Sequence, residues 1–173
     1  TVLHQGGRWA AGLLWLALAW AALRPPAFMR ALARSERWQL VLGVLLAVLV
    51  VDLLKHFSST SCPWALLEFG GRASHVSHWR WGVADGGDGR CFPAAHASAG
   101  FSFMTTWFVW RRHAARMATW WLVGALLAGT AFGVAQQLRG AHFLSHTLWT
   151  AWICLATGWA VDVLFRATRS RPL

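Results

Sequence analysis

Apolar residues occur in five long stretches along the chain, with short polar or basic segments between them. The stretches cover residues 9–23, 38–54, 94–110, 118–138 and 142–165. A helix rises about 1.5 Å per residue, so segments of this order of length can cross the hydrocarbon core of a bilayer. The pattern therefore predicts an all-α fold. It predicts a polytopic membrane bundle with five visible transmembrane helices, formed by a single domain over residues 1–173.

The composition supports a membrane protein and argues against other classes. Hydrophobic residues make up 57% of the 173 residues and charged residues only 13%. That leaves too little polar surface to cover a soluble globule. The formal net charge of +10 is accompanied by 14 tryptophans and long apolar stretches, so an anionic membrane surface is the expected partner and nucleic acid is not.

The distribution of cations predicts the orientation in the membrane. If the five stretches cross alternately, ten of the 16 Lys and Arg residues fall on one side and six on the other. Cytoplasmic segments carry the excess of positive charge, so the ten-cation side is predicted to be cytoplasmic. The chain then starts outside, and we expect a sixth helix upstream. We predict a multi-pass protein of a bacterial inner membrane with residues 55–93 as a periplasmic loop. The sequence carries no indication of the oligomeric state.

Ionisable side chains gather at the predicted outer ends of these helices. Lys55, the one lysine in the chain, ends the second stretch and His96 opens the third. Arg139 and His142 lie between the fourth and fifth stretches, and His146 follows one turn later. Imidazoles that attack or donate a proton, beside cations that offset phosphate charge, suit phosphoryl transfer. The predicted active site therefore lies at the outer membrane face.

Three short segments carry these residues in a fixed order. They read KHFSSTSCP from Lys55, PAAH up to His96, and AQQLRGAHFLSH up to His146. This order resembles the type 2 phosphatidic acid phosphatase superfamily, whose motifs are K-x6-R-P, P-S-G-H and S-R-x5-H-x3-D. Cys62 and Gln136 stand at the positions of the family's two arginines, and His146 stands at the position of its final aspartate.

The resemblance implies a metal-independent lipid phosphatase or phosphotransferase that needs no cofactor. Its substrate would be a lipid that carries a phosphate monoester or a diphosphate. Carried over by position, His142 attacks phosphorus to form a phosphohistidine, His96 protonates the leaving oxygen, and Lys55 binds the phosphate. Arg139 lies three residues after Gln136, and we expect it to supply one of the missing phosphate-binding charges.

The missing aspartate leaves open which group orients the nucleophile. His146 is a candidate because a neutral imidazole can accept a hydrogen bond from His142. Asp52, one turn before Lys55, is the other candidate, and a simple ion pair with Lys55 is its plainer interpretation. Two further alternatives remain open. The chain could be a non-catalytic family member, or it could hold a metal or haem with His96, His142 and His146.

The predicted topology also leads to a prediction for the cysteines. Cys62 and Cys91 lie in the same external loop, whereas Cys154 lies inside the fifth stretch. Disulfides persist on the oxidising side of a membrane. By elimination, Cys62 and Cys91 are predicted to form a disulfide that ties the first motif to the second, and Cys154 is predicted to stay a buried thiol.

Overall fold

The computed structural model describes residues 2–80 and 82–169, and its regular structure is helical. The longer helices are α1 (Val2–Leu23), α2 (Arg34–Phe57), α5 (Ala115–Gln137) and α6 (Leu144–Arg169). Between α2 and α5, the helices α3 (Ala95–Phe101), η4 (Ser102–Thr106) and α4 (Trp107–Trp110) follow one another without a break. Short 3-10 turns lie at η1 (Ala27–Met29), η2 (Pro63–Ala65) and η3 (Leu67–Phe69). The predicted all-α fold is confirmed.

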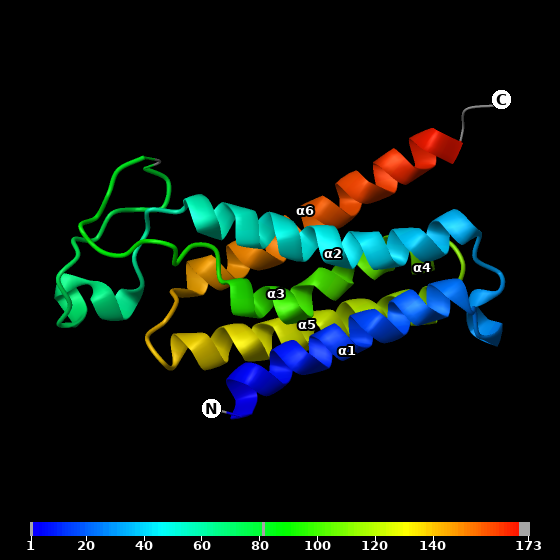
Figure 1. Ribbon diagram of the computed structural model, residues 1–173, viewed down its shortest axis with the longest axis horizontal. Coiled ribbons are helices and arrows are strands. Elements are labelled where there is room, and N and C mark those ends of the chain that lie inside the picture. The colour runs from blue at the N-terminus through cyan, green and yellow to red at the C-terminus, as the bar shows by residue number, and fades with distance from the viewer. Residues whose placement is uncertain (1, 81, 170–173) are drawn as a thin grey trace.

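The segment from α3 to α4 is the centre of the bundle. It packs against α2, α5 and α6, while α1 packs against α2 and α3 (Figure 1). The long loop between α2 and α3 and the turn between α5 and α6 lie at the same end of the bundle (Figure 1). The connection from α1 to α2 and the turn before α5 lie at the opposite end.

Three described helices are long and apolar enough to cross a membrane, namely α2, α5 and α6. The helix α1 is of similar length but is not among these three. The central segment is divided into pieces that are each too short for a span. The predicted count of five transmembrane helices is therefore supported for three of them, and it stays a prediction for α1 and the central segment.

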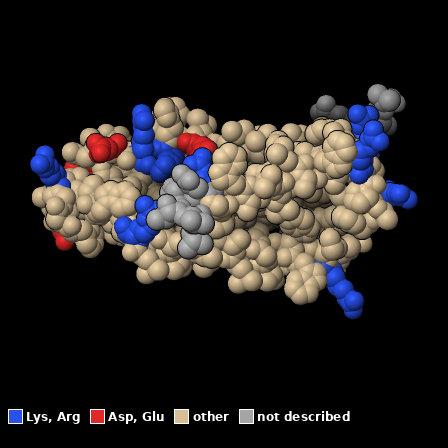
Figure 2. All heavy atoms as spheres, turned by 60° about the horizontal axis from the view of Figure 1, so that its bottom comes forward, with Lys and Arg blue, Asp and Glu red and all other residues tan. Residues whose placement is uncertain are grey.

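Charged side chains are separated from the apolar middle of the molecule. On the face shown in Figure 2, Lys, Arg, Asp and Glu gather toward the two ends, and the band between them carries none. Large apolar side chains such as Trp20, Trp120 and Trp159 are exposed on the helices, each at 59% or more. Lipid tails are the solvent in which such a surface is stable.

Small residues and hydroxyl groups allow the central segment to sit so deeply. A Cβ added at Gly100 in α3 would overlap the backbone of Gly129 in α5, so only glycine permits this approach. Thr106 donates a hydrogen bond to the carbonyl oxygen of Phe103 at 2.7 Å. Such back-bonding competes with the regular helical ladder, and it accompanies the change from α to the tighter 3-10 geometry.

A network of ionic groups joins α2, the turn that follows α4, and α6 at the end opposite the long loop. The fully buried carboxylate of Asp162 accepts hydrogen bonds from Gln39 at 2.8 Å and from Arg112. Glu36 accepts a hydrogen bond from Arg169 at 2.8 Å and lies 3.0 Å from His113. A buried carboxylate is tolerated when it is paired and hydrogen-bonded in this way.

Candidate active site

A cavity of about 400 Å³ opens between α1, α2 and α3 at the end that carries the long loop. Lys55 and Asp52 contribute to its wall from the last two turns of α2, and His96 contributes from the first turn of α3. Two of the predicted site residues from separate motifs, Lys55 and His96, therefore face one space. Arg8 of α1 also lines this cavity, although the sequence argument gave it no role.

His142 lies in the turn that precedes α6, near enough to Lys55 and His96 for their charges to act on it, although it is not among the residues that line this cavity. His142 lies between the fourth and fifth apolar stretches as predicted, and α6 begins after it at Leu144. A turn instead of a helix carries His142, and it leads from Gly140, whose φ of +67° is in the left-handed region that glycine adopts without strain. The His142 side chain is only 6% exposed, so packing fixes its orientation.

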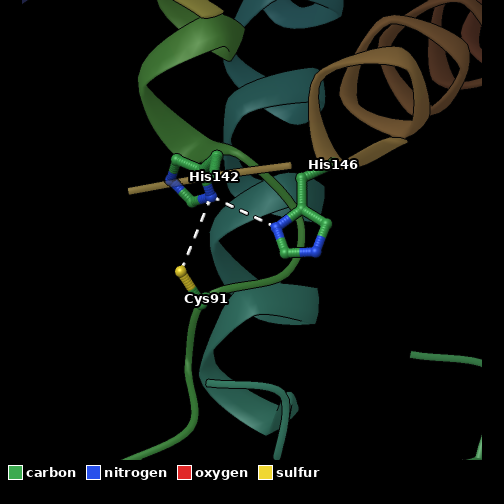
Figure 3. Close-up of side chains that lie close together, drawn as sticks. All are labelled: Cys91, His142 and His146. Carbon is green, nitrogen blue, oxygen red and sulfur yellow. Dashed lines mark hydrogen bonds between the residues drawn. The ribbon is translucent and has the colours of Figure 1, made fainter. Parts of the chain in front are cut away.

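The Nδ1 atom of His142 has two close partners. It lies 3.3 Å from Nδ1 of His146 and 3.6 Å from Sγ of Cys91 (Figure 3). A neutral His142 that carries its proton on Nδ1 can donate it to Nδ1 of His146. The second ring nitrogen of His142 points away from both partners (Figure 3). This tautomer leaves the lone pair of Nε2 for bond formation.

The surroundings of His142 favour its neutral form. Burial lowers the pKa of His142 to about 3, and the positive charges of Lys55, His146 and His96 act in the same direction. Withdrawal from water and nearby like charges both disfavour the imidazolium ion. A neutral imidazole keeps the lone pair that a nucleophile needs.

The predicted disulfide between Cys62 and Cys91 is confirmed, with the two Cα atoms 5.1 Å apart. The Sγ atom of Cys91 also lies 2.9 Å from the carbonyl oxygen of Ala141. The disulfide therefore connects the first and second motifs and touches the turn that carries the third. Cys154 is a buried thiol, as predicted.

A carboxylate that the sequence argument missed organises the long loop. Asp85 accepts hydrogen bonds from the backbone N–H of Ser61 at 2.6 Å, from the Ser61 hydroxyl at 2.8 Å and from the backbone N–H of Gly87 at 3.0 Å. Burial alone would raise the pKa of Asp85, but these hydrogen bonds outweigh it and the pKa is lowered. No sequence signal distinguished Asp85 from the other polar residues of the loop.

His78, a histidine of the long loop, belongs to the surroundings of the site. Its ring stacks on Phe92 with centroids 4.4 Å apart and meets the edge of His146 at 5.9 Å. Burial, with the charge of His75, lowers the pKa of His78. His78 and His146 line a second cavity of about 400 Å³ under the loop, so His146 separates this space from His142.

The remaining predicted residues occupy different positions. Arg139 is exposed in the turn after α5 and is not among the residues that line either cavity. Gln136, at the family's arginine position, is buried. Asp52 lines the cavity beside Lys55, whereas His146 is the group in contact with His142. The phosphate-binding role of Arg139 stays a prediction.

The possible metal ligands form a different set from the one predicted. Among the described residues, Cys91, His142 and His146 bring their donor atoms within 4.8 Å of one another, and His96 is not part of this group. Cys91 belongs to the disulfide, so its sulfur is not a thiolate. With Cys91 oxidised, two imidazoles remain of the four ligands that a structural zinc site uses.

An apolar groove continues from the first cavity. It encloses about 540 Å³ between α1, α3 and α5 and shares Ala11, Ala99 and Phe103 with the wall of the cavity that holds Lys55. Leu14 and Trp120, both exposed, are on its rim. A cavity that carries charged side chains and leads into an apolar groove matches the form of an amphiphile, with a charged head and a hydrocarbon chain.

Comparisons with known proteins agree with the motif pattern. No curated protein and no solved structure gives a significant match. The sequence model of the PAP2 superfamily matches residues 36–169, a segment that includes Lys55, His96 and His142. Members of this superfamily are typically metal-independent phosphatases. Since the match covers most of the chain, the protein belongs to the PAP2 superfamily.

Proposed function

We propose that this protein is a lipid-phosphate phosphatase or phosphotransferase that works through a phosphohistidine at His142. One observation carries the proposal: Lys55 and His96 face one cavity, and a buried, neutral His142 lies within reach of the charges of both, with its Nδ1 atom in contact with His146. Family membership supports phosphatase-type chemistry.

The reaction proceeds in two steps. In the first, Nε2 of His142 forms a bond to phosphorus while the bond from phosphorus to the leaving oxygen breaks. His96 gives that oxygen a proton, and Lys55 offsets the charge on the phosphate oxygens. In the second, His96 takes a proton from water, the water oxygen attacks phosphorus, and His142 leaves. An alcohol in place of water would make the second step a phosphotransfer.

The apolar groove supports a lipid as the substrate. Its direct continuation from the cavity would receive an acyl or prenyl chain while the phosphate stays beside Lys55. Both a phosphate monoester and a diphosphate present the same terminal phosphoryl group. In a bacterial inner membrane with the site on the periplasmic face, such a lipid would reach the cavity from the outer leaflet.

The test is phosphate release from a panel of purified lipid monophosphates and diphosphates. We expect wild-type turnover with and without a chelator, and loss of turnover in His142→Ala and His96→Ala, because nucleophile and acid serve the same reaction. His56→Ala is the matched control and should keep wild-type turnover, since His56 is exposed beside Lys55 at the C-terminal end of α2. Loss of activity on chelation that is restored by added metal would contradict the mechanism.

A trapping experiment separates the nucleophile from the acid. Acid-labile, base-stable radiolabel from a phosphate-labelled lipid should appear on the wild-type protein after brief mixing. The label should be absent from His142→Ala. Labelling of His142→Ala equal to wild type would exclude His142 as the nucleophile.

A further inference from the structure

The phosphate-binding charge of the family is largely absent from its usual positions in this chain. Cys62 stands at the first arginine position and is held in a disulfide, and Gln136 at the second position is neutral and buried. Lys55 is left as the cation that the motifs supply to the cavity. A phosphate monoester carries nearly two negative charges at neutral pH, so one ammonium group compensates them incompletely.

The cavity contains a guanidinium group from outside the motifs. Arg8 lines it from the second turn of α1, together with Lys55 of α2 and His96 of α3. Arg8 precedes residue 36, where the match to the PAP2 superfamily begins. The helix that carries it packs against the two helices that carry Lys55 and His96.

Arg8 fits a phosphate better than it fits a plain anchoring role. Anchoring at the interface requires an arginine that points to the headgroups, but it does not require one that shares a cavity with a lysine and a histidine. Asp52 in the same wall can pair with either cation while the cavity is empty of substrate. The planar fork of arginine binds two phosphate oxygens at once, which the point charge of lysine does not.

We propose that Arg8 binds the phosphate group of the substrate together with Lys55, in place of the arginines that the motifs have lost. The inference rests on the proposed function, and it makes α1 part of the active site. It also assigns this role to Arg8 instead of Arg139, because both side chains are exposed but only Arg8 is among the residues that line the cavity.

The test uses the full chain in detergent with the lipid phosphate that the wild type hydrolyses fastest, and inorganic phosphate as a competing head group without a tail. We expect Arg8→Ala to raise both KM and the inhibition constant of inorganic phosphate by roughly tenfold, the value of a charge-assisted hydrogen bond. Arg8→Lys should recover part of this loss, because it keeps the charge but not the fork. Arg72→Ala, an exposed cation of the long loop, is the matched control and should match the wild type.

The outcomes distinguish this inference from the function on which it rests. If the wild type releases phosphate from none of the lipids, the proposed function fails. If the wild type is active and Arg8→Ala leaves both constants unchanged, only the role of Arg8 is overturned. The same holds if Arg139→Ala raises both constants and Arg8→Ala does not. An unchanged thermal melting profile of Arg8→Ala shows that its effect is on binding and not on folding.

Discussion

Nδ1 of His142 lies 3.3 Å from Nδ1 of His146, and this contact stands where related enzymes have a histidine and a carboxylate. A neutral imidazole can fix the tautomer of its neighbour by accepting one hydrogen bond. It adds no negative charge, so it does not stabilise a positive charge that develops on His142. The pair therefore provides orientation without the electrostatic assistance of a carboxylate.

His146 can be tested by two substitutions. His146→Ala should lower kcat by roughly 10- to 100-fold with little change in KM, because a misoriented nucleophile mainly affects the chemical step. His146→Asp restores the family residue and should retain more activity than His146→Ala. Equal kcat values for wild type and His146→Ala in steady-state assays would show that the contact has no positioning role.

The lowered pKa of His142 has consequences for stability at acid pH. The pKa falls from 6.5 to about 3, so between these two pH values His142 is protonated in the unfolded chain and neutral in the folded protein. Above pH 6.5 His142 is neutral in both states and does not reduce the free energy of unfolding. As the pH falls from 6.5 toward 3, protonation of His142 in the unfolded chain lowers the free energy of unfolding. We expect the melting temperature of the wild type to fall across this window more steeply than that of His142→Gln. Parallel curves of melting temperature against pH would contradict the buried, neutral state.

The disulfide between Cys62 and Cys91 closes a loop with a sequence separation of 29. Replacing both cysteines by serine should lower the free energy of unfolding by about 3–4 kcal/mol, mainly because the unfolded chain regains freedom. Thermal melts in detergent measure this change. Cys154→Ser, which alters a buried thiol of α6, controls for the loss of a cysteine as such.

Removal of the disulfide should also create a zinc-binding site and make the enzyme sensitive to inhibition by zinc. In Cys62→Ser the thiol of Cys91 is released within 4.8 Å of the nearest ring nitrogens of His142 and His146. Thiolate and imidazole are preferred zinc ligands. Micromolar zinc should therefore inhibit Cys62→Ser more strongly than the oxidised wild type, as measured by phosphate release. Equal inhibition of both proteins would place the zinc elsewhere.

The buried carboxylate of Asp162 should contribute to stability more than to turnover. Asp162→Ala leaves Arg112 and Gln39 without their shared acceptor and should cost about 3–5 kcal/mol, as for other broken buried ion pairs. Arg112→Met combined with Asp162→Ala should recover part of this loss. A double-mutant cycle followed by thermal melting measures the coupling, and additive effects would show that the pair is not coupled.

The sequence predicted the helices better than their ends, for a physical reason. The length of an apolar stretch identifies a buried or lipid-facing helix. It does not show where the backbone hydrogen bonds of that helix begin, end or change from α to 3-10 geometry. The third stretch is apolar over residues 94–110, yet it is divided into α and 3-10 pieces, and it contains hydroxyl groups and Gly100. The last apolar stretch includes His142, but α6 begins only at Leu144, because Gly140 allows a turn before it.

For the candidate site, the order of the motifs predicted the residues whose positions follow from the local sequence. It did not predict the residues that only tertiary packing brings to the site. Lys55, His96 and His142 follow from their positions at predicted helix ends. Arg8 and Asp85 do not, since contacts between segments distant in the sequence bring each of them to its position. In the sequence, His78 does not differ from the other histidines of the loop, because only the folded loop stacks its ring on Phe92.

The groove between α1, α3 and α5 has a kinetic consequence. A substrate whose chain enters there need never leave the bilayer, so its effective concentration is a number of molecules per unit of membrane area. The rate should then depend on the mole fraction of substrate in a micelle or vesicle, and not on the bulk molarity. Diluting the lipid phosphate with an inert detergent at constant total substrate would slow such an enzyme, because the reaction takes place in two dimensions.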